Sequence, residues 1–201
     1  MEATVTQLTE RLAALPMRSI VAIAGPPGAG KSTLAEALAG KLSDTAILPM
    51  DGFHYDDAIL RDRGRLAHKG APDTFDVGGL LSVLERLREA TSDVAVPVFD
   101  RDLEISRGSA RIIPYRTRLI LVEGNYLLLD RTPWQGLAPC FDLTVMLRVP
   151  RDELARRLTG RWQHYGLTAE EIARKLETND LPNGDTVREE SCDADLVVVN
   201  G

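Results

Sequence analysis

The chain has 201 residues and a formal net charge of −6 at pH 7; 44% of its residues are hydrophobic and 27% are charged. This length fits one α/β domain with a single substantial core, and the composition argues against a disordered chain or a membrane-spanning protein. The acidic charge argues against a nucleic-acid partner held by general electrostatics. The N-terminus has acidic and polar residues where a signal peptide has a basic start and an apolar block, so we expect a cytoplasmic protein.

Apolar segments of strand length alternate with segments of helical spacing along the chain. An amphipathic helix within Met1–Leu15 precedes a buried strand over Ser19–Ala24, and a helix over Gly30–Leu42 follows it. Strands that are apolar on both faces and alternate with helices predict a parallel sheet covered on both sides. The later predicted elements are strand Thr45–Met50, helix Asp76–Ala90, strands Leu119–Glu123 and Leu143–Val149, helices Arg151–His164 and Thr168–Glu177, and strand Leu196–Val199.

The strongest motif is Gly25–Ser32 (GPPGAGKS), which matches G-x-x-x-x-G-K-[ST] between a predicted strand and a predicted helix. Its glycines let the loop wrap closely around phosphates, and backbone N–H groups at the start of the helix point at the anion. We expect Lys31 to reach the β- and γ-phosphates of ATP and Ser32 to place its hydroxyl on Mg²⁺. The predicted nucleotide-binding residues are Gly25, Pro26, Pro27, Gly28, Ala29, Gly30, Lys31, Ser32 and Thr33.

Two acidic residues stand where predicted strands end. Glu123 closes the apolar run LILVE, so it is a candidate for organising Mg²⁺, directly or through water. The alternative is a carboxylate that only caps the next segment. Asp51 directly follows Thr45–Met50 and is a candidate base for accepting the proton of an acceptor hydroxyl. A second metal-shell carboxylate or a turn residue is the alternative for Asp51, because Asp51-Gly52 is a common turn dipeptide.

Three stretches stand in the order GPPGAGKS, MDGFHYDD and LILVEGNYLLL. In this order they resemble the phosphoribulokinase/uridine kinase family, which includes the bacterial type of pantothenate kinase. Lys69–Leu81 and Pro97–Arg107 are similar to substrate-side segments of that family. Within the family, the chain most resembles the proteins labelled fructose transport system kinases.

These patterns together predict a single P-loop kinase domain over residues 1–201. We expect a three-layer α/β fold of the P-loop NTPase type, with a five-stranded parallel sheet in the order 2-3-1-4-5 and helices on both faces. Residues 51–75 and 94–114 are polar or irregular and long enough to be acceptor-side insertions. The resemblance implies that a lid covers about residues 148–165.

The resemblance also implies roles for single residues. Asp51 would be the catalytic carboxylate, and Arg157 and Arg161, one helical turn apart, would reach the transferring phosphate. A solvated basic face is the alternative for the two arginines. Residues 179–183 and the final strand would approach the adenine. The residues expected around the acceptor are Phe53, His54, Tyr55, Asp100, Arg101 and Glu123.

We therefore predict an ATP- and Mg²⁺-dependent kinase that phosphorylates a hydroxyl of a small molecule, with Lys31, Asp51, Arg157 and Arg161 as catalytic residues. The small number of aromatic residues favours a sugar such as fructose or another hexose; a nucleoside or a pantothenate-like alcohol is the alternative. The non-kinase alternative is a regulatory nucleotide-binding ATPase. We expect no nucleic-acid or membrane partner, and a homodimer is one expectation for the assembly.

Overall fold

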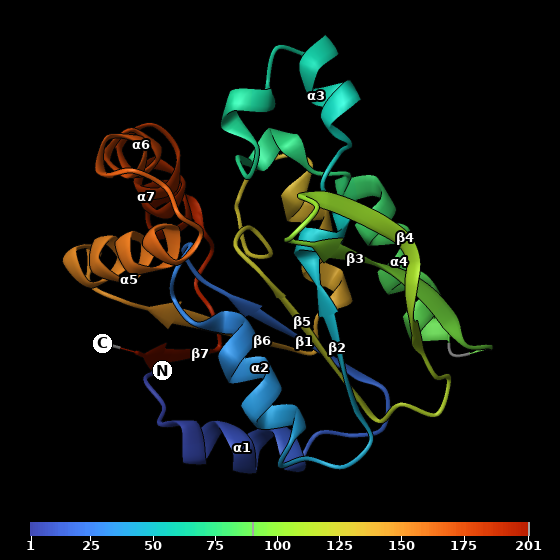
Figure 1. Ribbon diagram of the computed structural model, residues 1–201. Helices are drawn as coiled ribbons and strands as arrows, with labels where there is room; N and C mark the ends of the chain where they lie inside the picture. The colour runs from blue at the N-terminus through green and yellow to red at the C-terminus, as the bar shows by residue number, and fades with distance from the viewer. Residues whose placement is uncertain (90, 201) are drawn as a thin grey trace.

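A five-stranded parallel sheet forms the centre of the molecule (Figure 1). The structure is a computed structural model that describes residues 1–89 and 91–200. The strand order is β2-β5-β1-β6-β7, which becomes the predicted 2-3-1-4-5 when the two hairpin strands β3 and β4 are left out of the count. The sheet strands are β1 (Ser19–Ala24), β2 (Thr45–Pro49), β5 (Leu119–Gly124), β6 (Leu143–Arg148) and β7 (Leu196–Val199).

Seven α-helices lie in the described part of the chain, and most begin or end within a few residues of the predicted limits. Two were not predicted, α3 and α7, because α3 is short and α7 contains Pro182, Asn183 and Gly184. Ala90, the predicted end of one helix, lies outside the described residues. None of the helices is long and apolar enough to span a bilayer. The helices are α1 (Val5–Ala13), α2 (Lys31–Ala39), α3 (Asp57–Asp62), α4 (Val77–Glu89), α5 (Arg151–His164), α6 (Ala169–Lys175) and α7 (Leu181–Glu190).

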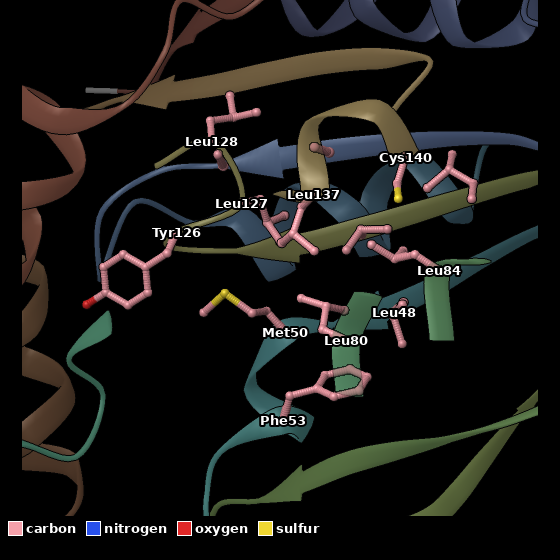
Figure 2. Close-up of a cluster of buried hydrophobic side chains, with 14 of the residues drawn as sticks. Leu48, Met50, Phe53, Leu80, Leu84, Tyr126, Leu127, Leu128, Leu137 and Cys140 are labelled. Carbon is pink, nitrogen blue, oxygen red and sulfur yellow. The ribbon is translucent and has the colours of Figure 1, made fainter. Parts of the chain in front are cut away.

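The two faces of the sheet carry separate apolar clusters. Alternation along β1 shows the division, since Ile20 and Ala22 belong to one cluster and Val21 and Ile23 to the other. The first cluster includes α4 and the segment after β5, and Figure 2 shows its side chains between those elements. The second cluster includes side chains of α1, α2 and α5. This arrangement is the three-layer fold predicted from the alternation of strands and helices.

Two segments outside the sheet shape the acceptor side of the molecule. β3 (Val94–Asp100) and β4 (Ile105–Ile113) form an antiparallel hairpin with a register shift between Val96 and Val98. The other segment follows β2 and contains a 3-10 turn at Met50–Phe53, helix α3 and two more 3-10 turns. In Figure 1 the segment after β2 lies beyond the ends of β2 and β5, and the hairpin runs beside β2.

A π-helix joins α6 to α7 over Leu176–Asp180. The sequence predicted one helix over Thr168–Glu177, so the element type of this segment was missed. A π-turn holds an extra residue compared with an α-turn, and such turns occur often at functional sites. Here the π-helix is followed at once by α7, and it leaves Asn179 and Asp180 buried although both are polar.

Candidate functional site

The loop between β1 and α2 has the conformation that phosphate binding requires. Gly28 and Gly30 have φ values of +79° and +88°, a region that L side chains rarely adopt. A Cβ atom on Gly28 would lie 3.1 Å from Leu158 of α5, and one on Gly30 would lie 2.9 Å from the Asn200 amide nitrogen. Glycine is therefore needed here both for backbone conformation and for close approach of α5 and Asn200. The loop ends at the N-terminus of α2, where free N–H groups favour an anion.

The order of the strands brings three functional segments to one edge of the sheet. β5 pairs with β1 on one side and β2 on the other, so that Glu123 is level with Pro49 and Gly124 is level with Ala24. Asp51 follows β2 by two residues, and the phosphate loop follows β1. A Cβ atom on Gly124 would lie only 2.4 Å from the Met50 Cβ atom. The glycine thus lets the turn that carries Asp51 pack directly against the end of β5.

Lys31 is buried, with 8% of its surface exposed. Its ammonium group donates to the Pro26 carbonyl at 3.0 Å and to Asn125 Oδ1 at 2.7 Å. Burial lowers the pKa of Lys31 to about 8, while Glu123 and Asp51 oppose that shift. The Lys31 cation is therefore held between the phosphate loop and two carboxylates.

Glu123 and Ser32 could hold a magnesium ion together. Burial, and then the charge of Asp51, raises the pKa of Glu123, whereas Lys31 and a hydrogen bond with Ser32 oppose the rise. No group of three or more His, Cys, Asp or Glu side chains in residues 1–89 and 91–200 could hold a metal by itself. Mg²⁺ in phosphoryl-transfer sites is bound through one or two side chains together with phosphate oxygens, so the pair fits this ion.

Asp51 lies beside these groups and is held by two neighbours. Arg101, from the hairpin, donates to Asp51 Oδ2 at 2.5 Å, and His54 Nδ1 donates to the Asp51 carbonyl at 2.8 Å. Burial alone would raise the pKa of Asp51, but His54, Arg101 and Lys31 outweigh it and keep this pKa below its usual value. Burial in turn lowers the pKa of His54. Asp51 is thus a carboxylate at neutral pH.

A cavity of about 650 Å³ connects the phosphate loop with the hairpin and the helices α5 to α7. This volume is within the usual range for small-molecule sites. Asp51 and the phosphate loop line it together with a set of polar side chains, which are Asp57, Lys69, Glu104, Asn179, Asp180 and Asn183.

The two predicted lid arginines differ in their surroundings. Arg157 donates to Glu153 Oε1 at 2.6 Å and to the Asn200 carbonyl at 2.8 Å. Because the Asn200 amide donates to the Ala29 carbonyl, Arg157 is connected to the phosphate loop. Arg161 lies deeper, and burial lowers its pKa, as does Arg101, while Asp51 and Asp180 oppose the change. Both arginines line the cavity.

The sequence from residue 20 to residue 200 matches the phosphoribulokinase/uridine kinase family. The chain belongs to this family. A crystal structure of a candidate fructose transport system kinase from Silicibacter sp. TM1040 has a TM-score of 0.90 and 37% identity, and the match covers 97% of this chain and 98% of that one. The fold and the phosphate loop are therefore those of a P-loop kinase.

Two further relatives of this kinase are named for acceptors other than a sugar. A candidate uridine kinase of Schizosaccharomyces pombe is 30% identical over 194 residues, which are 90% of this chain and 83% of that protein. The pantothenate kinase of Coxiella burnetii is 31% identical over 116 residues, which are 54% of this chain and 36% of that protein. Membership thus establishes a P-loop kinase, and the acceptor has to be inferred from the cavity.

Several of the kinase's predicted acceptor residues lie away from the cavity. Phe53 is 6% exposed and points into the core, as Figure 2 shows. In the 3-10 turn, residues three apart share a side, so Asp51 and His54 face the cavity while Met50 and Phe53 face the core. Tyr55 lies outside the cavity under the Arg63 guanidinium, and Asp100 pairs with Arg107.

The other predicted residues of the kinase lie at the cavity or behind it. His54, Arg101, Glu123, Arg157 and Arg161 line it together with Asp51. The phosphate loop contributes Pro27, Gly28, Gly30, Lys31, Ser32 and Thr33 to the lining, whereas Gly25, Pro26 and Ala29 are behind it. Residues 179–183 stay a prediction for the adenine side, and within them Asn179 donates to the Lys69 carbonyl on the acceptor side.

Several cavity residues of the kinase were missed. Asn125 binds Lys31 and comes two residues after Glu123, so its place beyond a strand end was a usable signal. Lys69 begins a segment that resembles the substrate side of the family, and it donates to Asp57 at 2.6 Å and to the Glu104 carbonyl. Phe75 and Phe99 lie in the two segments that resemble the substrate side of the family, but neither residue was singled out, because folding alone brings them together.

Proposed function

We propose that this kinase transfers the γ-phosphate of ATP to a hydroxyl group of a neutral sugar. The observation that carries the proposal is the position of Asp51, which lies in one cavity with Lys31 and Arg161. A carboxylate at this point can accept a hydroxyl proton while cations on either side stabilise the transferring phosphate. A protein that only binds or hydrolyses nucleotide does not need the large polar space beyond Asp51.

Each residue has a separate task in this proposal. The phosphate loop and Lys31 bind the β- and γ-phosphates, and Ser32 and Glu123 hold Mg²⁺. Bound ATP would supply the phosphoryl group, and Mg²⁺ would neutralise its charge. Asp51 orients the acceptor hydroxyl and takes its proton, with its own position fixed by Arg101. Arg161 stabilises charge on the transferring group, and Arg157 supports the nucleotide side through Asn200 and Ala29.

The segments around the cavity have matching roles. We assign residues 51–75 and 94–114 to the acceptor side and residues 148–165 to a lid, within one domain. Arg161 and Trp162 of the lid helix α5 both line the cavity, so closing of this helix would exclude water from the transfer. Exclusion of water matters because water would otherwise compete with the acceptor for the phosphoryl group.

Polar groups that line the cavity favour a sugar as the acceptor. Asp57, Lys69 and Glu104 line it together with the polar residues of the π-helix region. A sugar presents several hydroxyl groups, and each can pair with such side chains. The candidate fructose transport system kinase, at 37% identity over nearly the whole chain, also favours a hexose.

A nucleoside is the second candidate, because Phe75 and Phe99 line the same cavity. Their rings could flank a base, and the candidate uridine kinase of Schizosaccharomyces pombe is a relative. The His54 ring occupies the space between them, with its centroid 4.0 Å from that of Phe75 and 4.8 Å from that of Phe99. The aromatic residues therefore pack on one another, which makes the sugar the better fit.

The experiment is a coupled ADP-release assay with ATP and MgCl₂ over hexoses, pentoses, nucleosides and pantothenate. We expect ADP release to depend on the acceptor and to be fastest with a hexose such as fructose. Release at the same rate without any acceptor would support a regulatory ATPase and contradict the kinase proposal. ADP release only with uridine or cytidine would show that the acceptor is a nucleoside and would contradict the proposal of a sugar acceptor.

A further inference from the structure

Asp180 is a buried carboxylate that the proposed transfer does not use. It is 7% exposed, ends the π-helix, and lines the large cavity. One carboxylate oxygen, Oδ2, accepts from Trp162 Nε1 at 2.7 Å. Burial raises the pKa of Asp180, against the effects of Trp162, Lys175 and Arg161. The protein therefore keeps an acidic group in a place that disfavours its charge.

The charges near Asp180 do not form an ion pair with it. In residues 1–89 and 91–200, no Lys, Arg or His nitrogen lies within salt-bridge distance of its carboxylate. The nearby cations Lys175 and Arg161 instead stack on Trp162, at 4.4 Å and 5.2 Å from the ring centroid. A buried carboxylate with one protein donor retains capacity for further hydrogen bonds. Those bonds must come from donors that enter the cavity.

The position of Asp180 indicates which ligand supplies these donors. Arg161 is influenced by both Asp51 and Asp180, so it lies near each of them within the cavity. A carboxylate repels phosphate oxygens, so Asp180 does not bind the triphosphate of ATP. The side chain of Asn179, next to Asp180, donates to the Lys69 carbonyl on the acceptor side. A hydroxyl group donates a hydrogen bond and carries no charge. The fitting ligand for Asp180 is therefore the acceptor, at a hydroxyl other than the one that Asp51 deprotonates.

Neighbouring asparagines fix this part of the cavity wall. Asn183 donates to Asn179 Oδ1 at 3.1 Å, and Asn179 donates to the Lys69 carbonyl at 3.1 Å. The π-helix is thereby joined to the acceptor-side loop, whose Gly70 carbonyl accepts from the Tyr126 hydroxyl at 2.7 Å. Asp180 is thus carried by a segment with fixed contacts on the acceptor side.

We propose that Asp180 is a specificity-determining residue that accepts a hydrogen bond from a second hydroxyl of the acceptor, so the acceptor is a neutral polyol and not an anion. This inference rests on the proposed function and extends it. An acceptor with a carboxylate or phosphate at this end would be repelled by Asp180. A polyol such as a hexose places one hydroxyl at Asp51 and another at Asp180.

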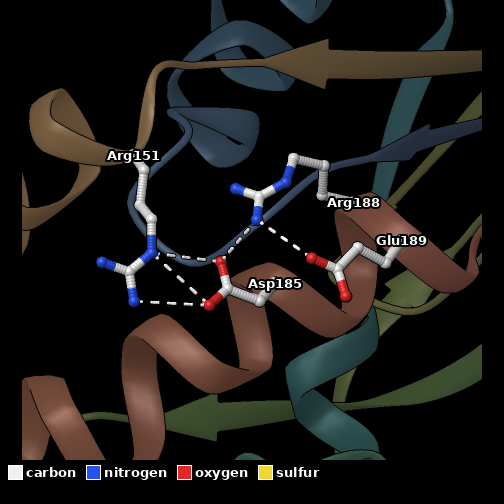
Figure 3. A network of polar contacts seen from close by, with 4 residues as sticks. All are labelled: Arg151, Asp185, Arg188 and Glu189. Carbon is white, nitrogen blue, oxygen red and sulfur yellow. Dashed lines mark hydrogen bonds and ion pairs between the residues drawn. The ribbon is translucent and has the colours of Figure 1, made fainter.

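The test uses the full-length kinase with fructose as the neutral polyol, and D-glycerate and pantothenate as anionic acceptors. Steady-state kinetics are measured for the wild type, Asp180→Asn and Asp180→Ala. The matched control is Asp185→Asn on the same helix. Asp185 pairs with Arg151 and Arg188 in a network on helices α5 and α7, and it does not line the large cavity (Figure 3).

We expect the wild type to phosphorylate fructose and to turn over the two anions poorly. Loss of a hydrogen bond to a charged group should raise KM for fructose about tenfold to a hundredfold in Asp180→Asn. The kcat value and KM for ATP should stay within about threefold, since neither depends on the second hydroxyl. Asp185→Asn should match the wild type in all three parameters. Circular dichroism of each variant checks that it is folded.

The outcomes separate this inference from the proposed function. Fructose turnover with an unchanged KM in both Asp180 variants would overturn the inference and leave the sugar kinase standing. A preference for D-glycerate or pantothenate over fructose would overturn both the inference about Asp180 and the proposal of a sugar acceptor. The phosphotransferase activity itself would stand. No acceptor-dependent ADP release with any of the compounds would overturn both proposals.

Discussion

Arg101 donates to Asp51 Oδ2 over 2.5 Å, although the two residues are 50 positions apart in the chain. Gly52 makes this pair possible, because a Cβ atom there would lie 2.5 Å from the Pro97 carbonyl oxygen of the hairpin. Ser106 adds a hydrogen bond from the hairpin to the Gly52 carbonyl. The hairpin therefore docks against the turn after β2 and fixes the carboxylate that we assign as the base.

Removal of the Arg101 guanidinium should impair catalysis more than nucleotide binding. In Arg101→Met, Asp51 loses its orienting partner, so we expect kcat to fall about tenfold to a hundredfold with KM for ATP changed less than threefold. The control is Arg107→Met, which removes an arginine that pairs with Asp100 outside the cavity. Equal kinetics in the two variants would show that Arg101 has no special role.

The sheet and the functional residues at the carboxyl ends of its strands could be predicted from the sequence, because their signals are local. A strand followed by a glycine-rich loop, or by an acidic residue, can be recognised in a short window, and strand order then places Lys31, Asp51 and Glu123 together. Phe53 was assigned to the acceptor pocket because the period of the turn was not known. In a 3-10 turn Phe53 falls on the core side, opposite Asp51 and His54.

The polar lining of the cavity around Asp180 was not predictable in the same way. Asp180 and Trp162 come from two different helices, and the π-helix that precedes α7 has no simple sequence pattern. Asn179 reaches the Lys69 carbonyl across 110 residues. Such contacts depend on how α5, α6 and α7 pack against the acceptor-side loop. The resemblance to a kinase family predicted the lid segment, but it did not predict which side chains of the lid helices line the cavity.

The two lid arginines should have separable effects. Arg161 faces Asp51 and Asp180, so Arg161→Met should lower kcat about a hundredfold. Arg157 binds the Asn200 carbonyl, which is linked to the phosphate loop, so Arg157→Met should mainly raise KM for ATP, by about tenfold. Arg156→Met is the control, since Arg156 pairs only with Glu153 on the exposed face of α5. Loss of kcat in both variants to the same extent would contradict this division.

Lys31 should be required for turnover without being required for folding. Its ammonium group is held by the Pro26 carbonyl and Asn125, and in use it would bind phosphate oxygens. We expect Lys31→Met to lower kcat at least about a hundredfold and to weaken binding of a fluorescent ATP analogue. Lys41→Met, at an exposed residue just beyond α2, should behave as the wild type. Normal turnover in Lys31→Met would exclude the phosphate loop as the nucleotide site.

Asp180 should carry a pH-dependent cost in stability. Its pKa is raised in the folded state, so its contribution to stability is fully present below the unfolded-state pKa and is lost as the pH rises through the folded-state pKa. The charged form is therefore the destabilising one, with Trp162, Lys175 and Arg161 only partly offsetting burial. Asp180→Asn, which does not titrate, should be more stable than the wild type at a pH above the folded-state pKa.

Urea unfolding at pH 7 and pH 5 measures this difference. The advantage of Asp180→Asn should be smaller at pH 5 than at pH 7, because protonation of the wild-type carboxylate removes the cost of burying its charge. A variant less stable than the wild type at pH 7 would indicate that Asp180 has a structural role. If Asp180→Asn is more stable than the wild type and also has a higher KM for fructose, Asp180 serves binding at a cost in stability.

The central claim is that Asp51 is the base of an acceptor-dependent kinase, and the most direct measurement is kcat of Asp51→Asn with fructose and ATP. Asparagine keeps the size and a hydrogen bond to Arg101 but cannot take the proton. We predict that kcat falls about a hundredfold to ten-thousandfold while Kd for ATP stays within about threefold. A kcat within about threefold of the wild-type value would contradict the claim.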